Sequence, residues 1–244
     1  MLEHDTLAGQ VIVVAGASSG MGHATALAAA ALGATVVLAA RNASALDELA
    51  ATITAAGGTA TVVPTDATDP DAAQHLVATA RDINGRIDAL VNSVGINIKG
   101  RSLDNLTLES WHGMVASNLD VAYYLTAAIV PVFRAQGGGL LLHISSIAAR
   151  KPDRSGVAYQ ATKAGVAALA LGTMEEEREH GMRVTVIYPG FTDTPLVLQR
   201  PVPPTPEALA LALKPEDVAA ACLYVLRQPS HVHIPEIVLM PSRS

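Results

Sequence analysis

The chain has 244 residues, of which 50% are hydrophobic, with a net charge of −6 and one cysteine. A chain this long and apolar can bury a large core, which excludes a disordered protein. The acidic balance leaves no basic footprint for nucleic acid or an anionic membrane, and a lone cysteine excludes an intramolecular disulfide. The start of the chain also lacks the basic and apolar stretches of a signal peptide, so we expect a cytoplasmic protein.

Short β-rich runs alternate with longer Ala- and Leu-rich helical stretches. The expected strands are Gln10–Ala15, Thr35–Ala39, Thr59–Val63, Ala89–Asn92, Leu140–Ile144, Arg183–Tyr188 and Glu236–Met240. The expected helices span 20–32, 43–56, 69–84, 108–136, 156–180 and 214–227. This alternation predicts an α/β, Rossmann-type doubly wound parallel seven-stranded sheet in a single domain over residues 1–244. The order 3-2-1-4-5-6 puts the third strand, closed by Pro64, at an edge where proline is tolerated.

A glycine-rich turn follows the first strand and opens the first helix. Such glycines allow a tight turn, and the N–H groups of a helix N-terminus favour the negative charge of a pyrophosphate. Placed after the first strand of a βαβ unit, the turn indicates a dinucleotide site. The residues predicted to form it are Gly16, Ser18, Ser19, Gly20, Met21 and Gly22.

The end of the second strand bears on the choice of dinucleotide. An NAD-binding fold usually places an acid here to hold the ribose 2′-hydroxyl, yet no Asp or Glu occurs between Gly22 and Asp47. Arg41, followed by Asn42, instead offers a guanidinium that can bind a 2′-phosphate through two hydrogen bonds. The alternative is a solvated arginine at a strand end. The missing acid favours NADP(H) over NAD(H).

Tyr159 and Lys163 lie four residues apart on a predicted helix, with Ser146 thirteen residues upstream of the tyrosine. Positions i and i+4 share a helix face, so the phenol and the ammonium point into the same space. A cation beside a tyrosine favours the phenolate and brings its pKa from ~10 toward the working range. Alone, the pair is more typical of an ordinary amphipathic helix, so the other motifs decide.

Together, these motifs resemble those of the compact single-domain short-chain dehydrogenase/reductase family, in the right order and over nearly the whole chain. The matches are Gly16, Gly20 and Gly22 for its glycine motif, Asp66 for its adenine-side acid, Asn92-Ser93-Val94-Gly95 for its Asn-Asn-Ala-Gly turn, Asn118 for its helix asparagine, Ser146 for its serine, Tyr159 and Lys163 for its Tyr-x-x-x-Lys, and Pro189-Gly190 for its Pro-Gly turn. The sequence departs from the family at Ala15, where Thr is usual, and at Ser93 and Val94.

The resemblance implies an enzyme that interconverts a small-molecule alcohol and carbonyl by hydride transfer. Tyr159 would be the general acid or base, and Ser146 would donate to the carbonyl oxygen as charge develops. Lys163 would lower the tyrosine pKa and contact the nicotinamide ribose, and Asn118 would hold a water. Ser145 rivals Ser146, but it would point to the opposite side of an extended segment. The implied cofactor site adds Asp66, Ala67, Asn92, Gly95, Tyr159, Lys163, Pro189, Gly190, Thr192 and Thr194.

Other functions and partners stay open. A cofactor-binding sensor or scaffold without turnover would not need all four catalytic residues, and an epimerase or dehydratase would need more chain for a nucleotide-sugar domain. The resemblance implies a homo-oligomer, a tetramer or dimer, that associates through helices 108–136 and 156–180. We expect no metal site, since the histidines have no cysteine or acidic cluster near them.

Two loops after the fourth and fifth strands carry an excess of positive charge. The residues are Lys99, Arg101, Arg150, Lys151 and Arg154. They are either solvated loop charges or partners for a substrate carboxylate. After the sixth strand, Phe191, Leu196, Val197 and Leu198 could form an apolar lid, followed by an irregular, proline-rich flap at Leu198–Pro206.

Overall fold

The computed structural model describes residues 6–243. The start of the chain, on which the expectation of no signal peptide rests, lies outside them. Within the described part, seven parallel strands form one sheet in the order β3-β2-β1-β4-β5-β6-β7. The strands are β1 (Val11–Ala15), β2 (Thr35–Ala40), β3 (Thr59–Pro64), β4 (Ala89–Asn92), β5 (Gly139–Ile144), β6 (Met182–Pro189) and β7 (Glu236–Leu239). The predicted Rossmann-type fold is confirmed, with β3 and β7 at the two edges.

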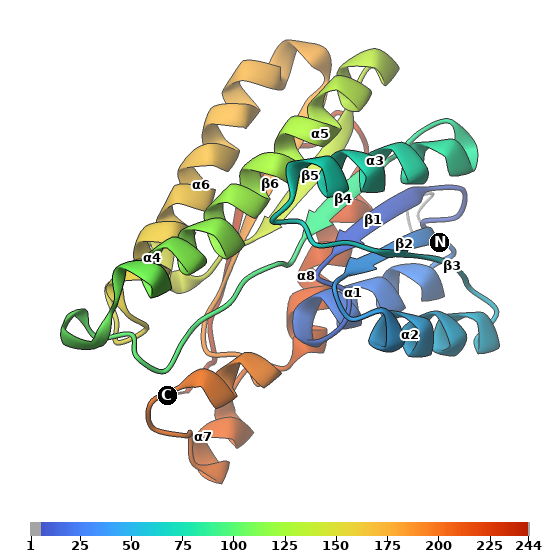
Figure 1. The fold of residues 1–244 in the computed structure, drawn as a ribbon. Coiled ribbons are helices and arrows are strands. Elements are labelled where there is room, and N and C mark those ends of the chain that lie inside the picture. The colour runs from blue at the N-terminus through green and yellow to red at the C-terminus, as the bar shows by residue number, and fades with distance from the viewer. Residues whose placement is uncertain (1–5, 244) are drawn as a thin grey trace.

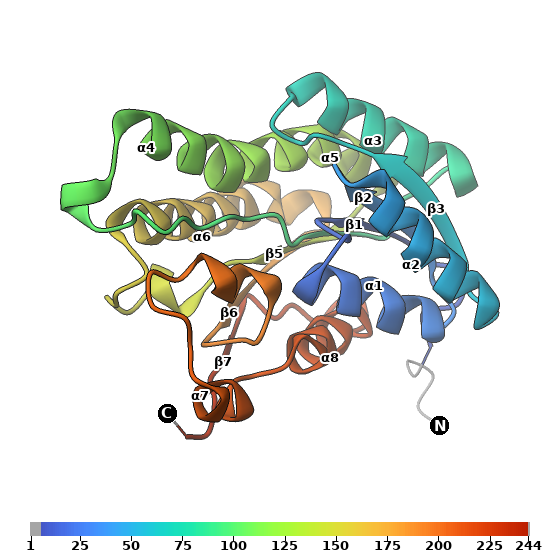
Figure 2. The ribbon, with the colours of Figure 1, turned by 60° about the horizontal axis from the view of Figure 1, so that its bottom comes forward.

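Helices cover both faces of the sheet (Figures 1 and 2). They are α1 (Gly20–Ala31), α2 (Ala43–Ala55), α3 (Pro70–Asn84), α4 (Leu108–Val115), α5 (Val121–Gln136), α6 (Val157–Glu177), α7 (Pro206–Leu211) and α8 (Pro215–Leu226). One face packs against α1, α2 and α8, and the other against α3, α5 and α6. Alternate β1 residues serve the two cores: Ile12 and Val14 face one, and Val11 and Val13 the other.

The structure corrects the helix predicted over 108–136. A π-helical turn at Ala116–Asp120 separates α4 from α5, so the run has an irregular centre. By length and composition alone, Leu108–Gln136 is the one helical run among the described residues that could cross a membrane. Core helices pass the same test, and Leu125, Ile129 and Phe133 of α5 are fully buried against the sheet.

The predicted flap is partly helical. Pro195–Gln199 forms a 3₁₀ turn before it, and Pro206 is the first residue of the short helix α7, capped by the Thr205 side chain. Elsewhere each predicted boundary differs from the observed one by at most one residue, except that α6 ends at Glu177 and a 3₁₀ turn completes the stretch to His180.

Candidate functional site

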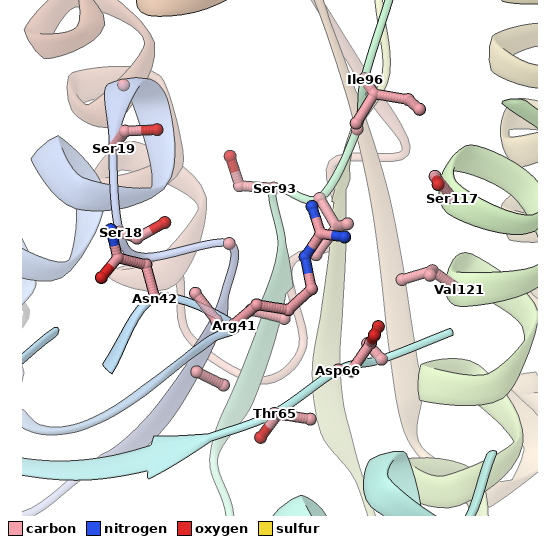
Figure 3. Close-up of a pocket in the computed structure, with 18 of the residues that line it drawn as sticks. Ser18, Ser19, Arg41, Asn42, Thr65, Asp66, Ser93, Ile96, Ser117 and Val121 are labelled. Carbon is pink, nitrogen blue, oxygen red and sulfur yellow. The ribbon is translucent and has the colours of Figure 1, made fainter. Parts of the chain in front are cut away.

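Two adjoining cavities lie at the carboxyl ends of the strands. The larger, about 360 Å³, is lined by the ends of β1 and β2 and by the residues that follow β3 and β4 (Figure 3). The smaller, about 150 Å³, is lined by residues that follow β5 and β6. Met21, Thr194 and Leu196 line both, so the cavities meet there. Parallel α/β sheets bind ligands at this edge.

The predicted site residues divide between the two cavities. The larger is lined by Gly16, Ser18, Ser19, Gly20, Met21, Arg41, Asn42, Asp66, Ala67, Gly95 and Thr194. The smaller is lined by Met21, Ser146, Tyr159, Pro189, Gly190, Thr192 and Thr194. Neither cavity is lined by Gly22, Asn92, Asn118 or Lys163. These four residues lie behind the lining residues and support them.

The glycine-rich turn leaves the start of α1 open to an anion. Ser19 is the N-cap residue, yet its side chain makes no capping hydrogen bond and the first turn has no acidic residue. The positive end of the helix dipole therefore faces the larger cavity without a partner from the cap. The turn is also tight: a Cβ on Gly22 would lie 2.3 Å from the Gly16 carbonyl oxygen, so only glycine fits.

Arg41 extends from the end of β2 into the larger cavity, between the Ser18–Ser19 turn and the helix that carries Ser117 (Figure 3). Its side chain forms no ion pair within the described part of the chain. Asp66 is the one carboxylate among the described residues that line this cavity. Hydrogen bonds from the Thr68 side chain and backbone N–H hold the Asp66 pKa below its usual range, so the carboxylate stays ionised. Asn42 caps α2 by accepting from Ala45 N–H.

Tyr159 and Ser146 share the smaller cavity. Burial raises the pKa of Tyr159, and its hydrogen bond with Ser146 lowers that pKa by less. In the free protein the phenol is therefore protonated at neutral pH, and the expected lowering by Lys163 does not prevail. Ser145 also lines this cavity, but its hydroxyl is already engaged, since it donates to the Lys163 carbonyl oxygen at 2.9 Å.

Lys163 lies buried behind Tyr159. Its Nζ is 5.9 Å from the centre of the tyrosine ring and donates to the Ile144 carbonyl oxygen at 3.2 Å. Burial lowers the pKa of Lys163 to about 8, because the charged amine has lost its water without gaining a carboxylate. At neutral pH the amine still carries most of its charge.

Asn118 lies in the π-helical turn and is buried. Its Oδ1 accepts from Ile96 N–H at 2.7 Å, and its Nδ2 donates to the Ile96 carbonyl oxygen and to Thr162 Oγ1. Asn118 thus ties the segment after β4 to α6, the helix that carries Tyr159. π-helical turns inside α-helices recur at functional sites.

A second hydrogen-bond network, around Asn92, also holds the segment after β4. Asn92 Oδ1 accepts from Val94 N–H at 3.0 Å, while its Nδ2 lies 3.1 Å from Nδ1 of His143. His143 Nε2 lies 3.4 Å from Thr126 Oγ1, which donates to the Ala122 carbonyl oxygen. This order requires a neutral imidazole that donates from Nε2. Burial first and the nearby charge of Lys163 second lower the His143 pKa to about 3, so the ring stays neutral.

The five cations of the loops after β4 and β5 are neither all solvated charges nor all at the cavity. Arg150 forms an ion pair with Glu236 and stacks on the Tyr188 ring, so it has a structural role. Lys99, Lys151 and Arg154 are exposed and line neither cavity. Of the five, Arg101 alone lines the smaller cavity.

The structure adds lining residues that the motifs did not indicate. In the larger cavity they include Thr65, Ile96, Ser117, Val121 and Pro195, and in the smaller Asn97, Asp153, Ser155 and Arg200. Ile96 directly follows Gly95, so the turn motif itself was the signal for it. No pattern in the sequence pointed to Arg200, which lies in the predicted flap. In the apolar lid, Phe191, Leu196 and Val197 line the smaller cavity, whereas Leu198 is exposed.

Other reactive groups play no part at this edge. Within residues 6–243, no group of three or more His, Cys, Asp or Glu residues could hold a metal ion. Cys222 is buried in α8, and burial raises the pKa of its thiol to about 12, which makes it unreactive.

Comparison with known proteins agrees with this geometry. A family model described as short chain dehydrogenase matches residues 10–201. An uncharacterized oxidoreductase of Staphylococcus haemolyticus is 35% identical over 235 residues, 96% of this chain and 98% of that protein. An uncharacterized oxidoreductase of Staphylococcus aureus is 34% identical over the same shares.

Solved structures show the same likeness. A metagenomic short-chain oxidoreductase in complex with NADP has a TM-score of 0.84 and 33% identity, covering 98% of this chain and 99% of that one. An alcohol dehydrogenase from Thermococcus sibiricus, complexed with 5-hydroxy-NADP, has a TM-score of 0.86 and 26% identity over 96% and 97% of the two chains. A 7α-hydroxysteroid dehydrogenase complexed with NADH and 7-oxo glycochenodeoxycholic acid has a TM-score of 0.88 and 26% identity over 99% and 98%. The chain therefore belongs to the short-chain dehydrogenase/reductase family of oxidoreductases.

Proposed function

We propose that the protein is an NADP(H)-dependent reductase and dehydrogenase that interconverts a carbonyl and an alcohol, with Tyr159 as the general acid or base. The observation that carries the proposal is the shared cavity of Tyr159 and Ser146, which adjoins the larger cavity at Met21 and Thr194. A substrate oxygen near both hydroxyls would lie at the junction where the two ligands meet.

Each residue has a role that its surroundings support. Tyr159 is protonated at neutral pH, which suits a proton donor in the reduction. Ser146 donates to the carbonyl oxygen as negative charge develops. Lys163 places a positive charge behind Tyr159 and favours the phenolate left after proton transfer. Asn118 holds the Ile96 segment in place, and the second lone pair of its Oδ1 remains for the predicted water.

The residues of the larger cavity suit a dinucleotide phosphate. The N-terminus of α1 would hold the pyrophosphate, Arg41 the ribose 2′-phosphate, and Asp66 with Ala67 the adenine side. When bound, NADPH supplies the hydride. The preference for NADP rests on Arg41 and on the lack of an acid at the end of β2. Two of the similar solved structures hold NADP or a derivative and a third holds NADH, so the family uses both.

The decisive experiment measures NADPH oxidation by the purified protein over a panel of aldehydes and ketones. We expect steady turnover of at least one carbonyl compound and none with Tyr159→Phe. If NADPH binds but no member of a broad panel is reduced, the enzyme proposal is overturned in favour of a sensor or scaffold. Conversion of a hydroxyl compound without net NADPH oxidation would favour an epimerase or dehydratase.

We also propose a single-domain, cytoplasmic protein that forms a homo-oligomer, a dimer or tetramer, through α4, α5 and α6. Leu108, Tyr123 and Val157 on these helices are 78%, 56% and 42% exposed, so each helix presents a large apolar side chain to solvent. Burying them against a second copy would remove that surface from water. Light scattering on the purified protein tests this, and a monomer at micromolar concentration would contradict it.

A further inference from the structure

We propose that the smaller cavity recognises the anionic group of a small carbonyl substrate, an oxo acid in the reduction and a hydroxy acid in the oxidation, through Arg200 with Arg101 beside it. This inference rests on the proposed function and names the substrate class of the same site. Both arginines line the cavity that contains Ser146 and Tyr159, although they come from segments on either side of the catalytic helix α6 in the sequence.

Arg101 is buried, only 8% exposed, and positions the wall of the cavity. Its Nε donates to the Ile98 carbonyl oxygen at 3.0 Å and its Nη2 to the Gln199 carbonyl oxygen. The second bond ties the loop after β4 to the end of the 3₁₀ turn Pro195–Gln199. Arg200 is the next residue, so Arg101 places it at the cavity.

The edge of the Arg200 guanidinium is available to bind an anion. Its guanidinium carbon lies 4.3 Å from the centre of the Phe191 ring. Stacking occupies the flat face of a guanidinium and leaves the N–H donors at its edge available for two parallel hydrogen bonds to a carboxylate. No ion pair of Arg200 with an acidic side chain occurs in the part of the chain that the structure describes.

The charges around the cavity are unbalanced. Arg101 and Arg200 contribute two positive charges, and Asp153 is the one acidic side chain among the described lining residues. Asp153 is exposed and already accepts from Ser155 N–H at 2.8 Å. Burial first and the charge of Arg200 second lower the pKa of Arg101, whereas the charge of Asp153 raises that pKa, so the three groups interact electrostatically. A substrate anion would supply the counter-charge that the protein lacks here.

A hydroxyl in the same wall has no partner. Ser155 Oγ is buried and forms no hydrogen bond within the protein among the described residues, and Ser155 lines the smaller cavity. Buried polar atoms are nearly always paired, so such an exception calls for a ligand or water. An acceptor oxygen of a bound anion would satisfy it. The neighbouring Asn97 amide already has partners in the Ser155 and Ile98 backbone groups, and one hydrogen of its Nδ2 stays available as a further donor.

The size and lining of the cavity limit the rest of the substrate. A volume of about 150 Å³ resembles that of cavities that hold a benzene-sized molecule. Met21, Phe191, Leu196 and Val197 provide apolar lining opposite the charges. A short alkyl or single-ring oxo acid fits this combination better than a long or neutral compound.

The test compares phenylglyoxylate with its methyl ester as substrates, using kcat/KM at fixed saturating NADPH. In the wild type we expect the acid to be preferred. Arg200→Ala should lower kcat/KM for the acid by roughly 10- to 100-fold and for the ester by far less, because the ester lacks the charge. Arg200→Lys should retain part of the preference. Arg154→Ala removes an exposed cation that lines neither cavity, and it should leave the ratio unchanged.

A second readout uses benzoate and benzamide, which carry no reducible ketone, as inhibitors of ester reduction. We expect benzoate to inhibit the wild type more strongly, and this difference to disappear in Arg200→Ala. Equal losses on acid and ester, or a wild type that favours the ester and is inhibited equally by both probes, would overturn the inference while leaving the reductase proposal intact. Failure of every carbonyl compound to oxidise NADPH would instead overturn the proposed function.

Discussion

Gly95 and Lys163 pack so closely that no side chain would fit between them. A Cβ built on Gly95 would lie 2.8 Å from Lys163 Nζ and 3.5 Å from Asn118 Oδ1. The amine therefore occupies the space that any other residue at position 95 would need. This contact links the turn after β4, which lines the larger cavity, to the helix that carries Tyr159.

Replacing Gly95 tests this contact. Gly95→Ala should displace the Lys163 amine, lower turnover and cofactor affinity, and destabilise the fold by about 1–3 kcal/mol through overpacking. NADPH titration, steady-state kinetics and urea unfolding measure the three effects. Gly113→Ala is the matched control, since a Cβ there meets nothing within 4 Å. The control should gain roughly 0.5–1 kcal/mol because alanine favours a helix. Normal kinetics in Gly95→Ala would show that Lys163 needs no fixed position.

Tyr159→Phe tests the proton donor. The variant keeps the ring and removes the hydroxyl, so turnover should fall on the order of 10²–10⁴-fold while NADPH still binds. Because the phenol is the acid form, reduction by the wild type should decline only as pH rises through the tyrosine pKa, which burial raises. Tyr224→Phe, which alters an exposed tyrosine on α8, is the control. Retained activity in Tyr159→Phe would show that Tyr159 is not the proton donor.

Arg41→Ala tests the choice of cofactor. Losing a charge-assisted contact with the 2′-phosphate should raise KM for NADPH by roughly 10- to 100-fold and change KM for NADH little. Lys151→Ala, which removes an exposed cation outside both cavities, should change neither. An equal rise in both KM values would mean that Arg41 supports the cofactor site without recognising the 2′-phosphate.

His143 should make stability depend on pH. Its pKa is about 3 in the folded protein against an ordinary 6.5, so between these values the unfolded chain binds the extra proton. Stability from this group is complete above about pH 6.5 and is lost as pH falls toward 3, with a slope approaching about 1.4 kcal/mol per pH unit.

The measurement is urea unfolding at pH 7 and pH 5 for the wild type and His143→Gln. The variant carries no titrating group at this position, so its free energy of unfolding should fall less over the interval than that of the wild type. The carboxylates titrate in both proteins, and their contribution cancels in the difference. Parallel losses would show that His143 does not sense pH.

Much of the fold could be predicted from the sequence because its signals are local. Continuous apolar runs indicated strands that are covered on both faces, and the glycine turn after β1 marked the start of α1. Tyr159 and Lys163 could be paired because helix geometry places positions i and i+4 on one face. The spacing of such motifs can be recognised in the sequence without knowledge of the tertiary structure.

Other features depend on contacts between distant segments, which no local pattern encodes. The π-helical turn at Ala116–Asp120 makes the centre of one long apolar helical run irregular, and it places Asn118 where its side chain bonds to Ile96. The Tyr159 pKa is raised because burial outweighs the hydrogen bond with Ser146, a balance set by packing.

The positive side chains near the smaller cavity also show which features are local and which depend on tertiary contacts. The sequence indicates a group of five positive loop residues, and of these the structure pairs Arg150 with Glu236 on β7 and places only Arg101 at the smaller cavity. Arg200 reaches the same cavity because its flap folds back onto the loop after β4 through the Arg101–Gln199 bond. Charge type and number are local properties of a sequence. Which charges face one another depends on how the chain closes in three dimensions, and only the tertiary structure decided it.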